Sequence, residues 1–483
     1  MIRTSLYILA FVISLGVVAR SRSRIARQLV LVSCSYVVYM SWGKWFALVL
    51  FASTVMNFVL GQWLRRNSSA LILWLGIAFN LGLLCSYKYI PEMAVHLPLS
   101  SLQRFSHLAL PLGISFWTFQ AMSYLFDLYR GEELDPSFLE FALYMVFFPV
   151  AISGPICRMT EMLPQFRGGK KLEWQEISGG LRRIAMGVLM MQLARLLGQG
   201  ILSGDGLNSG FDHATQWTGL DAWCLAAGYG LQLFLDFAGY SHIAIGAAQA
   251  LGFVIPENFA RPFQATSPSV FWTRWHMSLS FWIRDYVFLP LATIRREVWW
   301  RNLILIVSMI AFGVWHRASV LFVLWGCYHG VLLVVHRQVQ QLERRLNWNP
   351  PELAWNFLSW LVTMMCVSLG WILFRANTLS EARQMLAAMA SPSTYFSHAL
   401  SASLYLLVGS VAVSYGLVVL ISAALGGPGS SAERLESRSP AINMLFRNRW
   451  FWIPPLYVIA LLLLVIVTHT RGTDAAQLMY RNF

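Results

Sequence analysis

Residues 269–291 read SVFWTRWHMSLSFWIRDYVFLPL and place two arginines, a histidine and an aspartate among seven aromatic side chains. As a single helix, this stretch would carry a mostly aromatic stripe and, beside it, a polar ridge with a four-residue step. The stripe consists of Trp275, Leu279, Trp282 and Tyr286, and the ridge of His276, Ser280 and Arg284. The pattern therefore predicts an amphipathic helix.

Two interpretations of this helix are open. In the first, the tryptophans anchor it at a membrane interface while the arginines extend to the lipid headgroups. In the second, the polar ridge faces a site inside the protein, because an ionisable group in a membrane is costly and indicates function. Periodicity alone favours the first interpretation.

The rest of the chain indicates an all-α polytopic membrane protein. Of its 483 residues, 57% are hydrophobic and 12% are charged, and the mean hydropathy is +0.56, which excludes an ordinary soluble domain. Apolar runs recur at 71–87, 303–315, 353–374, 404–425 and 451–468. By the usual length for crossing a bilayer, we expect about ten to twelve transmembrane helices.

The loop after the first apolar run, residues 6–19, predicts the orientation of the chain. This run ends in arginines instead of a small-residue cleavage site, so we expect a retained crossing and not a signal peptide. The arginines are Arg20, Arg22, Arg24 and Arg27, and Arg65 and Arg66 follow two crossings later. Because basic loops favour the cytoplasmic side, the N-terminus is predicted to lie outside.

Charge and cysteine usage limit the partners. The net charge of +14 comes mostly from short loops between apolar runs, as topology signals and contacts with anionic lipids require. We therefore expect no nucleic acid partner. The cysteines stand singly, without metal-ligand spacing, which predicts core thiols and no metal site. They are Cys34, Cys85, Cys157, Cys224, Cys327 and Cys366.

The organisation of the chain predicts one integral domain over residues 1–483, with a flexible polar loop at 426–450. Two apolar segments, 110–131 and 269–291, are interrupted; the first opens with Pro111 and Gly113. Within hydrocarbon an irregular backbone survives only where protein or a water-filled cavity satisfies it. We therefore expect re-entrant or interfacial helices around a cavity.

Common catalytic signatures, such as H-E-x-x-H, G-x-S-x-G and the P-loop, do not occur in the sequence. One H-x-x-x-x-D pattern, HTRGTD at 469–474, follows the last apolar run, and we attribute it to chance. Histidine remains as the candidate reactive group.

Three of the ten histidines, His276, His316 and His329, lie in or beside apolar runs. A neutral imidazole can remove the proton of a hydroxyl group, and a second can orient the first or polarise a carbonyl. On one helix, His316 and His329 would lie about 20 Å apart and on different faces, whereas His276 and His316 can converge from different elements. For each histidine the alternative is a hydrogen-bonded core residue.

Several segments together resemble the membrane-bound O-acyltransferase (MBOAT) superfamily, specifically its bacterial branch with alginate O-acetyltransferases and the D-alanyl transfer protein of teichoic acid synthesis. The histidine of FWTRWHMSLSFWIRDYVFLPL precedes that of GVWHRASVLFVLWGCYHG by forty residues. Further matches are LPLGISFWTFQAMSYLFDLYRG, FFPVAISGPICRMTEMLPQF and LFLDFAGYSHIAIGAAQALGFVIPENFARPF. The resemblance extends over about residues 110–335, in family order.

The resemblance implies a ring of helices around a thinned membrane centre, with a tunnel from a cytoplasmic donor entrance to an outer acceptor side. It implies that His316 is the catalytic base and that His276 fills the second catalytic position. Supporting or tunnel positions would be Trp275, Ser280, His329, Arg284, Asp285, Asp236, Tyr240 and Asn258. It also implies a location in the bacterial cytoplasmic (inner) membrane.

Three departures from the family pattern concern the substrate. Arg317 replaces the glycine usual after the signature histidine, and it could narrow the tunnel, bind an acidic group or point outward. His242 stands where the alginate type usually has aspartate. The segment VLMMQLARLLGQG lacks a lysine pair common near that position.

The leading hypothesis is transfer of an acetyl group, from acetyl-CoA or another thioester, to a hydroxyl of an exported or cell-envelope polysaccharide. The transfer would be direct or through a periplasmic acetyltransferase partner, and no cofactor would be bound. The alternatives are D-alanyl transfer from an acyl-carrier protein, a polysaccharide or lipid transporter or flippase, and a pseudoenzyme disabled by Arg317. No internal repeat supports the transporter.

Overall fold

The computed structural model describes residues 2–91, 109–168, 172–201, 205–213, 217–348 and 350–424. These residues form an all-helical protein without a β-strand. The flexible loop predicted at 426–450, the apolar run at 451–468 and the HTRGTD pattern lie outside the described residues. All six cysteines are free thiols, as expected.

The helices follow one another along the chain with short connections. The first group comprises α1 (Ile2–Arg20), α2 (Arg24–Met40), α3 (Lys44–Arg66) and α4 (Ala70–Lys88). The second comprises α7 (Ile114–Tyr129), α8 (Phe138–Val146), α9 (Met159–Arg167), α10 (Trp174–Gln199), α11 (Leu207–His213) and α12 (Gly219–Ala250). The third comprises α13 (Pro268–Trp272), α14 (Met277–Ile283), the π-helix η2 (Arg284–Phe288), α15 (Leu289–Ala292), α16 (Val298–His316), α17 (Val320–Arg345), α18 (Glu352–Arg375), α19 (Leu379–Ala390) and α20 (Ala402–Ala424). Two short 3-10 helices are Pro262–Gln264 and Pro392–Phe396.

Six of the described helices are long and apolar enough to cross a membrane: Lys44–Arg66, Ala70–Lys88, Val298–His316, Val320–Arg345, Glu352–Arg375 and Ala402–Val419. They confirm a multi-pass membrane protein. The expected total of about ten to twelve crossings also counted the run at 451–468, and that total stays a prediction.

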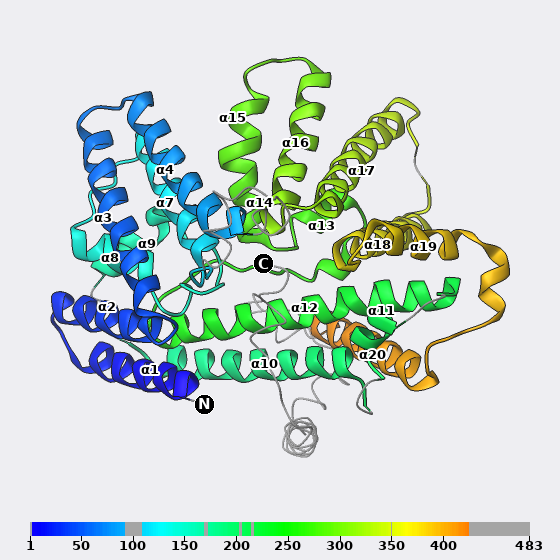
Figure 1. The fold of residues 1–483 in the computed structure, drawn as a ribbon, viewed down its shortest axis with the longest axis horizontal. Coiled ribbons are helices and arrows are strands. Elements are labelled where there is room, and N and C mark those ends of the chain that lie inside the picture. Colours follow the sequence, from blue (N-terminus) through cyan, green and yellow to red (C-terminus); the bar gives the residue numbers. More distant parts are fainter. Residues whose placement is uncertain are drawn as a thin grey trace.

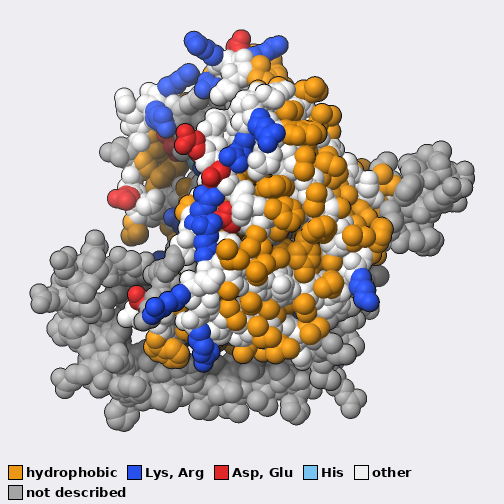
Figure 2. Space-filling view, turned by 90° about the vertical axis from the view of Figure 1, so that its left-hand side faces the viewer, with side chains coloured by type: hydrophobic (Ala, Val, Ile, Leu, Met, Phe, Trp, Pro, Cys, Tyr) orange, Lys and Arg blue, Asp and Glu red, His pale blue; other side chains and the backbone are white. Residues whose placement is uncertain are grey.

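One face of the molecule has the character of a lipid-facing surface. Figure 2 shows a broad hydrophobic surface on the side that carries α1 to α3, bordered by a row of Lys and Arg side chains. Its exposed apolar residues include Ile8, Val12, Leu29, Leu48 and Val55. Apolar side chains in this number are expected against lipid tails, and a basic border against headgroups.

Helices α10 and α12 pack antiparallel at close range, side by side below the centre of Figure 1. Their contact is made by glycines, because a Cβ on Gly180 would lie 2.4 Å from the Gly246 carbonyl oxygen and one on Gly187 would lie 2.4 Å from that of Gly239. Small residues let helix backbones approach in membranes. This pair forms a base under the inner ends of α4 and α16 (Figure 1).

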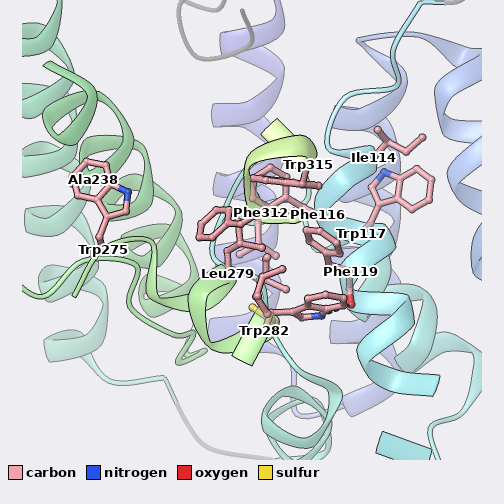
Figure 3. Packing of buried hydrophobic residues seen from close by; sticks show 14 of the residues in the cluster. Ile114, Phe116, Trp117, Phe119, Ala238, Trp275, Leu279, Trp282, Phe312 and Trp315 are labelled. Carbon is pink, nitrogen blue, oxygen red and sulfur yellow. Dashed lines mark hydrogen bonds between the residues drawn. The ribbon is translucent and has the colours of Figure 1, made fainter. Parts of the chain in front are cut away.

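The interrupted segment 110–131 forms the central helix α7, in which fourteen of sixteen residues are buried. It begins at Gly113, whose φ of 73° is in the left-handed region, and a Cβ there would lie 2.0 Å from the Ala151 carbonyl oxygen. In Figure 3, Phe116 and Phe119 of α7 face Trp282, Phe312 and Trp315. Protein therefore surrounds this irregular start, as the sequence predicted.

The single amphipathic helix predicted for 269–291 is wrong, because the stretch breaks at His276 (φ 42°, ψ 52°) between α13 and α14. The backbone bonds of Asn258 hold the break. Its carbonyl oxygen accepts from the Met277 amide at 2.9 Å, and its Oδ1 accepts from the Ser278 hydroxyl at 2.6 Å. These bonds satisfy amide and hydroxyl groups at the start of α14 that the helix itself leaves unpaired.

The aromatic stripe does not seat the stretch at a membrane interface, so this interpretation is also wrong. Trp275, Trp282 and Tyr286 are each at most 5% exposed. The Trp282 indole donates to the Phe119 carbonyl oxygen at 3.0 Å, and the Tyr286 hydroxyl donates to Asp127 at 2.8 Å. Interior packing and hydrogen bonds on α7 take up these side chains instead of lipid.

Candidate functional site

Two of the candidate histidines line one small cavity at the centre of the described structure. His276 and His316 share it with aromatic and aliphatic side chains: Leu233, Phe237, Trp272, Trp275, Phe312, Trp325, Trp371 and Phe374. Its volume is about 10 Å³, close to the minimum that holds one water molecule. An atom group of that size would touch both imidazoles.

The backbone break presents His276 to this cavity. Residues other than glycine rarely adopt a positive φ, and such strain concentrates at functional sites. The imidazole is 1% exposed, its ring centroid lies 4.6 Å from that of Phe237, and neither ring nitrogen has a hydrogen-bond partner among the described residues. Burial lowers the pKa of His276 to about 3, so at neutral pH its ring is uncharged, with one N–H to donate.

His316 enters the cavity as the last residue of α16. Its ring stacks on Phe312 at 5.4 Å and contacts Trp315 at 4.6 Å and Phe374 at 5.1 Å. The polypeptide turns at Arg317–Ser319 and returns as α17. Gly313 allows this tight hairpin, because a Cβ there would lie 2.1 Å from the Phe322 carbonyl oxygen.

His329 lies on α17 and not on the helix of His316, so the spacing argument for one helix does not apply. Both rings contact Trp325, at 5.9 Å for His316 and 4.9 Å for His329. His329 is buried behind Trp272 and Trp325 and is not among the residues that line the cavity.

Two indole N–H groups of the lining were not predicted from the sequence. Trp272 and Trp325 have buried Nε1 atoms with no hydrogen-bond partner among the described residues. A buried indole usually finds a partner, so these donors are available to a bound oxygen atom. With 21 tryptophans in the chain, no sequence signal distinguished these two.

The other predicted supporting residues lie around the cavity or farther away. Trp275 lines it, while Ser280 donates to the Trp275 carbonyl oxygen at 3.0 Å. Asp236 and Tyr240 lie on α12 beside the lining residue Phe237. The expected polar ridge does not form one surface, because His276 is buried whereas Arg284 is exposed.

Asp285 and Arg284 stand at the far end of α14, outside the lining. Asp285 accepts from Arg158 at 2.5 Å and from Arg284 at 2.6 Å, and Arg130 donates to its backbone carbonyl at 2.7 Å. Burial acts to raise the pKa of the Asp285 carboxyl, but the two guanidinium partners outweigh it and lower the pKa. This cluster joins the end of α7, the start of α9 and η2.

Arg317, the residue that departs from the family pattern, is exposed and does not line the cavity. His242, the second departure, accepts a hydrogen bond at Nδ1 from Arg183 at 3.1 Å, and Arg183 also pairs with Glu257. Neither residue touches the two histidines of the cavity.

A larger cavity of about 280 Å³ opens between α2, α9 and α10. Its lining includes Arg24, Gln28, Phe166 and Glu176 but no histidine. We place the chemistry at the smaller cavity, because only there do two imidazoles and two unpaired indole donors meet. Among the described residues, no three His, Cys, Asp or Glu side chains are grouped to hold a metal ion.

Comparison with known proteins gives the same direction as this geometry. The sequence pattern described as "MBOAT, membrane-bound O-acyltransferase family" matches residues 59–374, which include both histidines of the cavity.

Individual relatives cover most of the chain. A probable alginate O-acetylase of Pseudomonas aeruginosa is 33% identical over 387 residues, which are 76% of this chain and 71% of the relative. A peptidoglycan O-acetyltransferase of Helicobacter pylori is 31% identical over 77% of this chain and 75% of the relative. A teichoic acid D-alanyltransferase of Bacillus subtilis is 30% identical over 54% of this chain and 68% of the relative.

Proposed function

The chain belongs to the membrane-bound O-acyltransferase family, and from this premise we propose that it transfers an acetyl group from a thioester to a hydroxyl of an exported or cell-envelope polysaccharide. The observation that carries the proposal is the shared cavity of His276 and His316. A membrane O-acyltransferase needs a base and carbonyl-polarising donors at one point, and this cavity offers both.

In the proposed reaction His316 is the general base. Its imidazole takes the proton of the acceptor hydroxyl while the hydroxyl oxygen attacks the thioester carbonyl carbon. The negative charge that develops on the carbonyl oxygen is stabilised by N–H donors that are already in place. When the carbon–sulfur bond breaks, the proton passes from His316 to the leaving thiolate, which yields an ester and a free thiol.

The donor groups for that oxyanion are the neutral imidazole of His276 and the indoles of Trp272 and Trp325. All three are buried, and their nitrogen atoms lack protein partners among the described residues. An uncharged His276 suits this role, since a donor that is preorganised in a water-poor site costs little reorganisation. No cofactor takes part in this scheme.

The donor substrate in this proposal is acetyl-CoA or another acyl thioester. It would approach from the cytoplasmic side of a bacterial inner membrane, with the N-terminus of the chain outside. The row of basic residues beside the apolar face of α1 to α3 (Figure 2) supports this orientation, because basic residues favour the cytoplasmic border.

The acceptor is proposed from the relatives. Those with the highest coverage are named for the acetylation of alginate and peptidoglycan, which favours a glycan hydroxyl, reached directly or through a periplasmic partner. The teichoic acid D-alanyltransferase matches less of the chain, so D-alanyl transfer from a carrier protein is the second candidate. Family membership argues against a transporter, and the exposed position of Arg317 argues against a disabled site.

Ester-linked acetate on the envelope glycans of the producing strain tests this proposal. We expect its loss in His316→Ala and a large decrease in His276→Ala, with both proteins present in the membrane at wild-type level. His336→Ala is the matched control, because His336 lies on α17 away from the cavity. Unchanged acetylation in both cavity variants would exclude the assignment. Uptake of acyl groups by the purified protein from a carrier protein but not from acetyl-CoA would favour the second candidate.

A further inference from the structure

The C-terminal end of α4 holds the end of α16. Lys88, the last residue of α4, donates from its ammonium group to the carbonyl oxygen of Trp315. The next residue, Tyr89, donates from its hydroxyl to the Val314 carbonyl oxygen at 3.2 Å. Both contacts fall on the two residues that precede His316.

These contacts meet a need that α16 cannot satisfy itself. The last carbonyl groups of a helix lack amide partners, and the partial negative charge they carry attracts a cation. The backbone amide of Arg317 reaches Gly313 at 3.2 Å, which leaves the later carbonyls to other donors. Lys88 and Tyr89 are those donors for Val314 and Trp315.

Lys88 also fixes the side chain next to His316. Its Nζ atom lies 4.8 Å from the centroid of the Trp315 ring, within the range of a cation–π contact. The Trp315 ring in turn lies 4.6 Å from the His316 ring. The position of the His316 imidazole is thereby coupled to an ammonium group on another helix.

We propose that Lys88 is a positioning residue for His316, which fixes the orientation of this imidazole and, through its charge, keeps the imidazole unprotonated and able to act as a base. The inference rests on the proposed function, in which His316 is that base. Lys88 lies before the segment that carries the family motifs.

The charges around the end of α16 support this role. Lys88 faces it from α4, His276 from the start of α14, His329 from α17 and Arg375 from the end of α18, while Arg317 follows it directly. The parts of α7 that pack there are aromatic, at Phe116 and Phe119. These described elements present no carboxylate to His316, so the local charge disfavours a second positive charge on its ring.

A purely structural role predicts a different result from a positioning role. If Lys88 only stabilised α16, removing the Tyr89 hydroxyl would have the same kind of effect, because it bonds the same turn. If Lys88 acts on His316, only loss of the charge should change the pH dependence of the reaction.

The test measures acetyl transfer from radiolabelled acetyl-CoA to envelope glycan in membrane vesicles, between pH 5 and 9, for Lys88→Met, Lys88→Arg and Tyr89→Phe. Lys44→Met is the control, an exposed lysine at the start of α3. Thermal unfolding of each purified full-length variant reports stability separately.

We expect Lys88→Met to lower kcat by about 10- to 100-fold, the scale of a small misplacement of a catalytic group, with little change in KM for acetyl-CoA. The acid limb of its pH profile should move to higher pH, because His316 then protonates more readily. Lys88→Arg should restore most of both properties. Tyr89→Phe should lower the unfolding temperature without moving the profile, and Lys44→Met should resemble wild type.

The inference is overturned if the Lys88→Met profile coincides with that of wild type, or if Lys88→Arg fails to restore kcat. His316→Ala separates this from failure of the proposed function. If His316→Ala abolishes transfer while Lys88→Met leaves it intact, only the inference falls. If His316→Ala retains full transfer, both fall.

Discussion

The rings of His276 and His316 pack against the same side chain, Phe312, with centroid distances of 6.3 and 5.4 Å. Forty residues separate the two histidines in the sequence, and one stands in a backbone break while the other ends a helix. Phe312 thus holds two imidazoles at one cavity. A base and a carbonyl-polarising group can then act on one bond without metal participation being required by the geometry.

The role of His276 can be tested by an amide replacement. We expect His276→Asn to retain part of the activity and His276→Leu to lose it, because an amide still donates an N–H and an oxyanion donor is worth about 10²–10³ in kcat. Since burial lowers the pKa of His276 to about 3, its ring is neutral above about pH 4. The acid limb of the pH profile in His276→Asn should therefore coincide with that of wild type, and a displaced limb would contradict a neutral His276.

The two unpaired indoles predict an effect on rate. Trp325→Phe and Trp272→Phe keep an aromatic ring but remove the N–H, and we expect each to lower kcat more than it changes KM. The largest decrease expected for a direct donor is about 10²–10³. Trp282→Phe is the control, since its N–H already donates to the Phe119 carbonyl oxygen; it should lose stability instead of rate. Equal rates in all three variants would exclude the indoles as oxyanion donors.

The residues that follow α14 should contribute to stability and not to chemistry. Asp285→Asn removes the charge that pairs with Arg158 and Arg284, and we expect a loss of about 1–3 kcal/mol of unfolding free energy. Arg284→Ala should cost about 1 kcal/mol or less, because its side chain is half exposed. Calorimetry in detergent micelles measures both.

The same carboxylate predicts a dependence of stability on pH. The pKa of Asp285 is lowered in the folded protein, so its contribution is present above the unfolded-state pKa of about 3.9 and is lost as pH falls through the folded-state value. Wild type should therefore lose its advantage over Asp285→Asn in acid. An advantage that persists at the lowest pH would contradict the pairing.

A buried amide pair joins α3 and α4. The Asn80 side chain donates to that of Asn57 at 2.7 Å, and Asn57 donates back at 3.2 Å. We expect Asn57→Leu alone to cost about 0.6–1.7 kcal/mol, because it leaves the Asn80 oxygen without this partner. Asn57→Leu with Asn80→Leu should recover much of that loss. Ser86→Ala, at an exposed site of α4, should change nothing, and additive losses in the double variant would contradict pairing.

The substitution of histidine for the usual aspartate at position 242 predicts a gain by reversal. Burial, and then the nearby Arg183 charge, lower the pKa of His242, so Arg183 faces a neutral ring. His242→Asp would form an ion pair and should raise the unfolding free energy by about 1 kcal/mol or less at a partly exposed site. In an Arg183→Ala background the same change should bring no gain.

Chain order and residue type predicted a large part of the site. The pairing of His276 with His316 was expected from their separate elements and from the family resemblance, and the structure places both in one cavity. The break at His276 was not predicted, because its cause is remote: Asn258 is eighteen residues away in the sequence and bonds Met277 and Ser278. Helical periodicity carries no information on such a tertiary cap.

The aromatic residues show the same limit. A stripe containing Trp275 and Trp282 suits a membrane interface and a protein interior equally well, because both surroundings are apolar. Only the contact with α7 decided between them, through the Phe119 carbonyl oxygen that accepts from Trp282. Similarly, the indole donors of Trp272 and Trp325 became visible only when their surroundings proved to lack partners among the described residues.

The sequence by itself determined the membrane class, the helical architecture and the family, because these follow from hydropathy, length and motif order along the chain. The tertiary structure alone decided which side chains meet: that His276 leaves its helix, that His329 stands behind the cavity wall, and that Lys88 reaches the end of α16. Each of these depends on contacts between helices distant in the chain, and local pattern does not specify such contacts.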